Sequence, residues 1–117
     1  MYIEIAPPEY QVKLPQNTAK MYCFSLNIDG KVGWREPTTD ELFAISKSIE
    51  YDKWVSSAGS WCSDGWANIR DRWALPWSLV ADYELDTKRW VVPVRTLPEP
   101  TSLFRRLSYK WNGYYEI

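Results

Sequence analysis

The chain has 117 residues, of which 45% are hydrophobic and 25% are charged, and its formal net charge at pH 7 is −1. These values are ordinary for a folded globular protein and exclude the compositions of disordered, collagen-like and disulfide-rich chains. A chain of this length is expected to form a single globular domain, residues 1–117, around one hydrophobic core.

No targeting or membrane segment is predicted. The first residues, MYIEIAPPEY, lack the basic and apolar regions of a signal peptide, and no 18 consecutive residues are apolar. We therefore expect a cytoplasmic protein without a membrane partner, located in the host cytoplasm if a phage encodes it. Cys23 and Cys62 are too few for a disulfide framework and are expected to be free thiols.

The first third of the chain is predicted to be mostly extended. Tyr2–Ile5 is expected to form an edge strand that ends before two prolines, and residues 10–14 a second short strand. In residues 20–37, alternating apolar side chains predict a hairpin whose three-residue loop contains Gly30. Pairing of Phe24 with Trp34 across this hairpin would place Trp34 in the core.

Two helices are predicted in the middle of the chain. Thr38 and Glu41 have the spacing of a capping box and predict a helix from Thr38 to about residues 51–55. In residues 65–74, Trp66, Ile69 and Trp73 follow the i, i+3, i+7 spacing of an amphipathic helix. Trp66 and Trp73 are therefore interpreted as packing residues.

The last third is predicted to contain a hairpin and a helix. A turn at residues 86–89 would join two strands and place Asp82, Glu84 and Asp86 on one solvated face. A short helix from residue 101 to 109 is then expected to direct its apolar side chains, Leu103, Phe104 and Leu107, inward. The whole pattern predicts an α+β fold: a small antiparallel β-sheet built from hairpins, with two or three short α-helices packed on one side.

The composition argues against an enzyme. Without histidine the chain has no imidazole base, no histidine-activated nucleophile and no imidazole metal ligand, and it has no phosphate-binding or nucleotide-binding glycine motif. Cys62 before a predicted helix could have a lowered thiol pKa, but an inert thiol is the ordinary interpretation. We expect no catalytic residues, no bound metal and no cofactor.

Aromatic residues indicate a binding surface instead. Eight tryptophans and eight tyrosines are too many for full burial in a small domain, and Trp, Tyr and Arg dominate binding hot spots. The predicted partner-binding residues are Trp61, Arg70, Arg72, Trp77, Arg105, Arg106, Tyr109, Lys110, Trp111, Tyr114 and Tyr115, with Asp82, Glu84 and Asp86 as a second, acidic contact face.

The sequence therefore favours a small non-catalytic binding protein whose partner is another protein. Its profile is that of protein–protein inhibitors or modulators carried by phages and mobile elements, such as anti-defence and anti-CRISPR proteins. The alternative is a module that sequesters a nucleotide or another small ligand in an aromatic stacking pocket. A pI near 5.4 argues against extended nucleic acid as the partner, and homodimerisation through the aromatic surface is compatible with the pattern.

Overall fold

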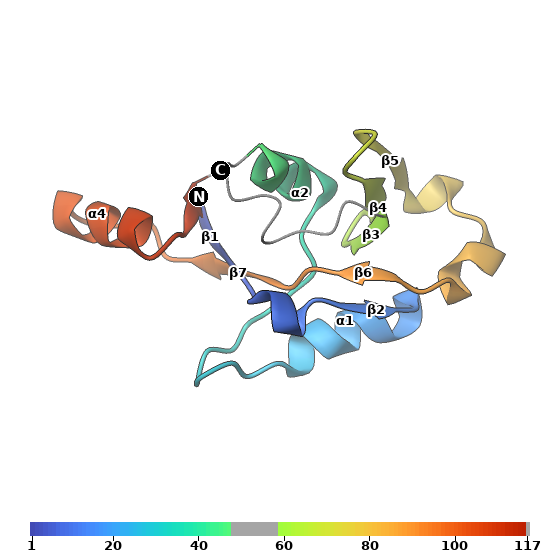
Figure 1. Ribbon diagram of the computed structural model, residues 1–117, viewed down its shortest axis with the longest axis horizontal. Coiled ribbons are helices and arrows are strands. Elements are labelled where there is room, and N and C mark those ends of the chain that lie inside the picture. The colour runs from blue at the N-terminus through green and yellow to red at the C-terminus, as the bar shows by residue number, and fades with distance from the viewer. Residues whose placement is uncertain (48–58, 117) are drawn as a thin grey trace.

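The computed structural model describes residues 1–47 and 59–116 and shows two β-sheets (Figure 1). The smaller sheet has the strand order β7-β1-β8, with β7 (Val94–Leu97), β1 (Tyr2–Ile5) and β8 (Tyr115–Glu116). The larger sheet has the order β2-β6-β3-β4-β5, with β2 (Val12–Leu14), β6 (Arg89–Val91), β3 (Gly59–Cys62), β4 (Gly65–Asn68) and β5 (Trp73–Pro76). Neighbouring strands are antiparallel except β3 and β6, which are parallel.

Helices cover both faces of the larger sheet. The α-helices in the described residues are α1 (Gln16–Ser25), α2 (Thr39–Ser46) and α4 (Leu103–Trp111), and the short 3-10 helices are η1 (Pro8–Tyr10), η2 (Trp77–Leu79) and η3 (Asp82–Asp86). In Figure 1, α1 lies below β6 and α2 lies above it. The predicted α+β class, with mostly antiparallel strands, is confirmed; its strands form two sheets, and its helices lie on both faces of one.

The core is built from side chains that point alternately to the two faces of the larger sheet along its central strands. Trp61, Trp66 and Val91 face α1, where they pack with Ala19 and Cys23. The next residue of each strand, including Cys62 and Ala67, belongs to a second cluster that contains Leu42 and Ile45 of α2. Because successive side chains of a strand point to opposite faces, three short strands supply the cores on both sides.

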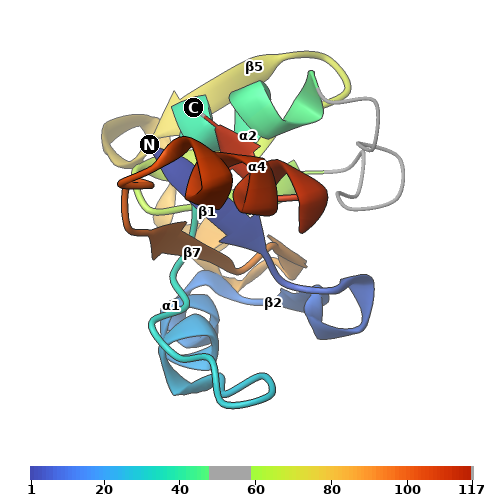
Figure 2. The same cartoon turned by 90° about the vertical axis from the view of Figure 1, so that its left-hand side faces the viewer.

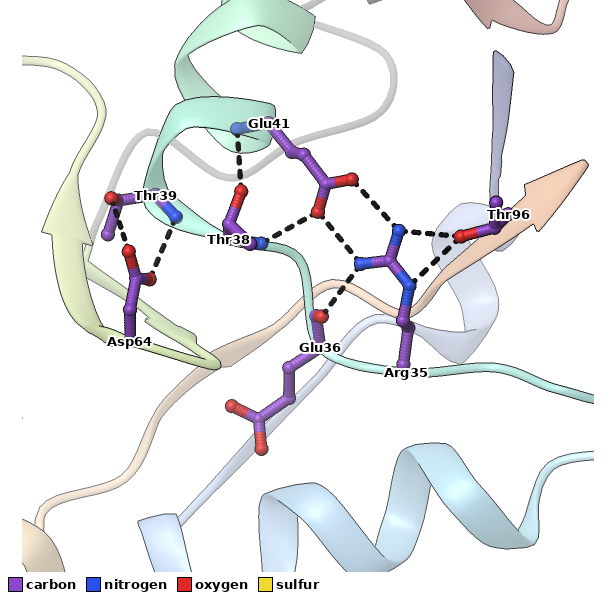
Figure 3. A network of polar contacts seen from close by, with 7 residues as sticks. All are labelled: Arg35, Glu36, Thr38, Thr39, Glu41, Asp64 and Thr96. Atoms are coloured by element: carbon purple, nitrogen blue, oxygen red, sulfur yellow. Dashed lines mark hydrogen bonds and ion pairs between the residues drawn. The ribbon is translucent and has the colours of Figure 1, made fainter. Parts of the chain in front are cut away.

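The predicted start of α2 is confirmed. Thr38 Oγ1 accepts a hydrogen bond from the Glu41 backbone N–H at 3.1 Å, and Glu41 Oε1 accepts one from the Thr38 N–H at 2.8 Å. Arg35 donates two further hydrogen bonds to the Glu41 carboxylate, each 2.8 Å long, and these lower its pKa (Figure 3). The helix α2 ends at Ser46 and is capped by Lys47, before the predicted end at residues 51–55, which itself lies outside the described residues.

The strand predicted at the start of residues 20–37 is wrong, because Gln16–Ser25 forms α1. Ala19 and Cys23, one helical turn apart, are fully buried, whereas Phe24 is 85% exposed. The small side chains let the helix approach the sheet closely, and this tertiary contact outweighs the alternating pattern. The predicted turn occurs at the expected place, but as a two-residue turn between Ile28 and Lys31. Trp34 is buried as predicted.

The helix predicted over residues 65–74 is also wrong, because β4 and β5 form a hairpin there. Gly65 has a φ of +153°, which favours glycine, and its missing Cβ leaves room for the Leu75 carbonyl of the neighbouring strand. Trp66 is buried as predicted. Trp73 is 42% exposed and touches the Trp66 ring only edge-on, at 4.7 Å between ring centroids.

Two further predictions about strands are corrected. The hairpin predicted around residues 86–89 does not form, because Asp82–Asp86 is the 3-10 helix η3 and β6 pairs with β2 instead. Val92 and Pro93 then carry the chain from the larger sheet into β7 of the smaller one. Tyr2–Ile5 is a strand as predicted, but it is the central strand of its sheet and not an edge.

Gly65→Ala should destabilise the fold by roughly 3 kcal/mol or more, because the new methyl group would overlap the Leu75 carbonyl oxygen of β5. Gly30→Ala is the matched control: Gly30 also has a positive φ, of +84°, but has open space around it, so about 1–2 kcal/mol is expected. Urea denaturation of the two variants compares these values, and equal losses would contradict the close approach at Gly65.

Candidate functional site

The structure places the predicted contact residues on separate elements. Arg105, Arg106, Tyr109, Lys110 and Trp111 lie together on α4, and Tyr114 and Tyr115 follow it. Arg70 and Arg72 are exposed in the turn between β4 and β5. Trp61 and Trp77 lie at the larger sheet, in β3 and η2. The predicted set therefore does not form one surface, and α4 holds its largest exposed group.

Helix α4 is attached to the protein through Tyr109. The Tyr109 ring makes edge-on contacts with Tyr2 at 5.2 Å and with Tyr114 at 5.5 Å between centroids. Its hydroxyl donates a hydrogen bond of 2.9 Å to the Pro98 carbonyl. Ser102 caps the helix by accepting from the Arg105 backbone N–H. These contacts fix the orientation of α4 and make Tyr109 a packing residue in the isolated chain.

The apolar side chains of α4 face solvent, so their predicted inward orientation is wrong. Large hydrophobic side chains are exposed at four positions of this helix, which we call the α4 apolar stripe: Leu103, Phe104, Leu107 and Trp111. At about 100° per residue, the stripe spans roughly 100° of the helix surface, and Tyr109 lies nearly opposite to it. Figures 1 and 2 show α4 as a helix at one end of the molecule.

The polar side chains of α4 are basic. Arg105, Arg106 and Lys110 are exposed, and the helix contains no acidic residue. Burial raises the pKa of the Tyr2 hydroxyl, and the nearby positive charge of Arg106 opposes this shift. The spacing of the stripe was visible in the sequence, but its direction was not, because only the contacts of Tyr109 show which side of the helix meets the protein.

Trp61 is a core residue, which corrects its prediction as a contact residue. Its side chain is 0% exposed, and its indole N–H donates a hydrogen bond of 2.8 Å to the Leu14 carbonyl. Trp77 stacks on it with ring centroids 5.9 Å apart and is only half-buried. The guanidinium of Arg89 lies 3.8 Å from the Trp66 ring centroid on the same side of the sheet. This aromatic cluster is packing, with Trp77 at its margin.

The acidic contact face is not formed as predicted. Asp82, Glu84 and Asp86 lie on the 3-10 helix η3, so they do not project in a row from one strand face. Asp82 and Asp86 are exposed, whereas Glu84 is half-buried near Arg89. Among residues 1–47 and 59–116, no group of three or more acidic or cysteine side chains is arranged to hold a metal ion.

Both cysteines are free thiols, as predicted, and both are buried. Cys62 lies in β3 and does not precede a helix, which corrects its predicted environment. Burial raises the pKa of the Cys62 thiol well above its usual value, and the nearby charge of Asp64 raises it further. Burial likewise raises the pKa of Cys23 to about 12. Neither thiol is ionised at neutral pH.

A cavity of about 430 Å³ lies between α1 and the segment that precedes α2. Lys20 and Phe24 of α1 line one side, Trp34 and Glu36 line another, and Ser63 and Trp77 belong to the hairpin end of the sheet. This site was not predicted from the sequence, although Trp77 was among the predicted contact residues. No local pattern indicated it, because the walls come from segments that are distant in the chain.

Glu36 is the unusual polar residue of this cavity. Its side chain is 7% exposed, and its Oε2 atom makes no hydrogen bond with the described residues, 1–47 and 59–116. Figure 3 shows the carboxylate turned away from the Arg35 network, while the Glu36 backbone carbonyl accepts from Arg35. Burial raises the pKa of this carboxyl to about 7, although the positive charge of Lys20 opposes the shift. Buried polar atoms without a partner are rare in folded proteins.

No protein-family model matches the chain, and comparisons with curated protein sequences and with solved structures find no match. The described parts of the chain contain no helix with the length and apolar character needed to cross a membrane.

Trp61→Ala should destabilise the protein by about 3–5 kcal/mol, because it removes a fully buried indole and leaves a cavity. Trp111→Ala, at a side chain that is 91% exposed, should change stability by no more than about 0.5 kcal/mol. Urea denaturation followed by far-UV circular dichroism measures both. Similar losses in the two variants would show that the core and surface assignments are wrong.

Glu36 should make the fold less stable as pH rises. The usual pKa of 4.5 applies to the unfolded chain, and the folded value is about 7, so the folded state holds the proton more tightly. The contribution of Glu36 to the free energy of unfolding is fully present below pH 4.5 and is lost as the pH rises to about 7. The loss amounts to roughly 3 kcal/mol of stability.

Glu36→Gln removes this titration, so the variant should be more stable than the parent at about pH 8 and similar at about pH 4.5. Urea midpoints at the two pH values measure the effect. Glu9→Gln, at an exposed side chain, should keep the parental pH dependence. An unchanged pH dependence in Glu36→Gln would show that another group is responsible.

Proposed function

We propose that this protein is a non-catalytic binding protein that contacts another protein through the α4 apolar stripe. The observation that carries the proposal is the solvent exposure of Leu103, Phe104, Leu107 and Trp111 on one side of a helix that is held in place from its other side. Isolated exposed apolar residues are common on protein surfaces, but a contiguous apolar stripe is typical of an interaction site.

The charge of α4 supports a partner of defined chemistry. Arg106 and Lys110 flank the stripe on one side and Arg105 lies beyond its other side, without an acidic residue in the helix. A helix of this kind binds in an apolar groove, where its spaced hydrophobic side chains act as anchors. The partner is therefore a protein whose apolar groove is bordered by acidic side chains, which attract the basic helix and select against basic surfaces.

The fixed position of α4 also favours tight binding. The contacts of Tyr109 with Tyr2 and Tyr114 order the helix before it meets a partner. A preordered element loses less conformational entropy on binding than a disordered segment does. A small rigid protein with one anchored helix is suited to occupying a site on its partner. Inhibition or modulation, as by small anti-defence proteins of phages and mobile elements, belongs to the same proposal.

The test uses the immobilised parent protein and two double variants to capture proteins from an extract of cells that express the chain, and it compares the amounts captured. Phe104→Ser/Trp111→Ser removes the two aromatic anchors, and the amount of specifically captured protein should fall by more than about tenfold. The matched control is Leu79→Ser/Tyr83→Ser, which alters two exposed hydrophobic residues outside α4 and should leave capture unchanged. A protein lost only with the α4 variant is then purified and titrated against the parent and both variants.

Two results would contradict the proposal. Equal capture by the parent and the α4 variant would place the contact elsewhere on the protein. Binding of α4 to vesicles of anionic phospholipid, without any protein that depends on the stripe, would show that the helix recognises a membrane surface instead. Thermal melts of both variants confirm that they are folded before either comparison is made.

A further inference from the structure

The cavity beside α1 has the properties of a small-ligand site. Its volume of about 430 Å³ falls within the range of pockets that bind small molecules, most of its lining surface is apolar, and three aromatic side chains contribute to it, Phe24, Trp34 and Trp77. Its walls come from α1, the segment before α2 and the end of the larger sheet, so the cavity forms only when these three parts of the chain are packed together. It is distinct from the α4 apolar stripe, which contributes no residue to it.

The carboxylate of Glu36 is a buried hydrogen-bond acceptor in the wall of this cavity. The side chain is more than nine-tenths buried, and its Oε2 has no hydrogen-bond partner in the part of the chain that the structure describes. Leaving a buried acceptor without a hydrogen bond costs about 1–3 kcal/mol, and more when the group is charged. A ligand that donates N–H groups to this carboxylate would recover that cost, whereas an apolar ligand would not.

The neighbouring polar groups are already occupied by the protein. The indole N–H of Trp34 donates to the Lys31 carbonyl at 3.0 Å, and that of Trp77 donates to the Ser63 carbonyl at 2.8 Å. The two tryptophans therefore offer their ring carbons, and not their N–H groups, to a ligand. The Arg35 guanidinium is also engaged, with Glu41 and Thr96, and so is not a ligand-binding cation here.

Two other side chains extend the site toward solvent. Phe24 of α1 is exposed and lines the pocket, so its ring is accessible to a flat ligand. Lys20, one helical turn before it, also lines the pocket and places a positive charge near Glu36. The site thus combines an inner carboxylate, aromatic walls and an outer cation. This combination favours a planar ring that has N–H donors at one edge and an anionic group at the other end.

We propose that this pocket binds a guanine mononucleotide, with Glu36 accepting the two N–H groups of the guanine edge, Phe24 and Trp77 contacting the base, and Lys20 beside the phosphate. Among the common bases, guanine presents two adjacent donors, its ring N–H and its exocyclic amino group, which match the two oxygens of one carboxylate. Adenine presents a ring acceptor at the corresponding place, which an ionised carboxylate repels.

The first test titrates the protein with GMP, IMP and AMP and follows the quenching of tryptophan fluorescence. It is done at about pH 8, above the Glu36 pKa of about 7, where the carboxylate is ionised. GMP should bind with saturation. IMP, which lacks the amino group, and AMP should each bind at least about tenfold more weakly, the difference expected for one missing or mismatched hydrogen bond.

The variants assign the contacts. Glu36→Gln should reduce GMP affinity by more than about tenfold and remove the preference over IMP, because an amide cannot accept two hydrogen bonds in the same way. Lys20→Ala should lower the affinity for GMP but not the affinity for guanosine, which has no phosphate. Glu9→Gln, at an exposed carboxylate, and Phe104→Ser/Trp111→Ser, on α4, should both bind GMP as the parent does. The last variant separates this site from the proposed protein contact.

Several results would overturn the proposal. The absence of saturable quenching at millimolar GMP would show that the pocket does not bind this nucleotide. Equal binding of GMP, IMP and AMP would show that the pocket does not read the guanine edge. Parental GMP affinity in folded Glu36→Gln would show that the buried carboxylate makes no contact with the base.

Discussion

The larger sheet is covered by helices on both faces, and most of the structure depends on this constraint. Each central strand must supply apolar side chains in both directions, so Trp61 faces α1 while Cys62 faces α2. The large side chains of these strands, Trp61 and Trp66, pack on the α1 side, and the small ones, Cys62 and Ala67, pack on the α2 side. This packing explains why Trp61 and Trp66 are not available for binding.

Arg35 connects this packing to the cavity. Its guanidinium donates to Glu41 at the start of α2 and to Thr96 in β7, and so joins a helix of one layer to the smaller sheet. It also donates to the backbone carbonyl of Glu36. The adjacent Glu36 side chain points away from this network toward α1, and its Oε2 has no hydrogen-bond partner among residues 1–47 and 59–116 (Figure 3). The network that stabilises the fold therefore also determines the polarity of the pocket.

The two proposed sites differ in how the fold produces them. The α4 apolar stripe belongs to one continuous segment and is exposed because Tyr109 occupies the opposite side of the helix. The pocket is assembled from α1, the segment before α2 and η2, and exists only when all three are packed.

Local chemistry determined what the sequence could predict. The capping box of Thr38 and Glu41, the last helix, the strand at Tyr2–Ile5 and the α+β class all depend on neighbouring residues or on composition. Tertiary structure decided the rest: α1 instead of a strand, the hairpin at Gly65 instead of a helix, and the burial of Trp61 and Glu36. For α1, Trp61 and Glu36 the deciding contacts join segments far apart in the chain, and the free energy of burying a side chain against them exceeds the small differences in local propensity. At Gly65 the deciding contact is the pairing of the neighbouring strands β4 and β5.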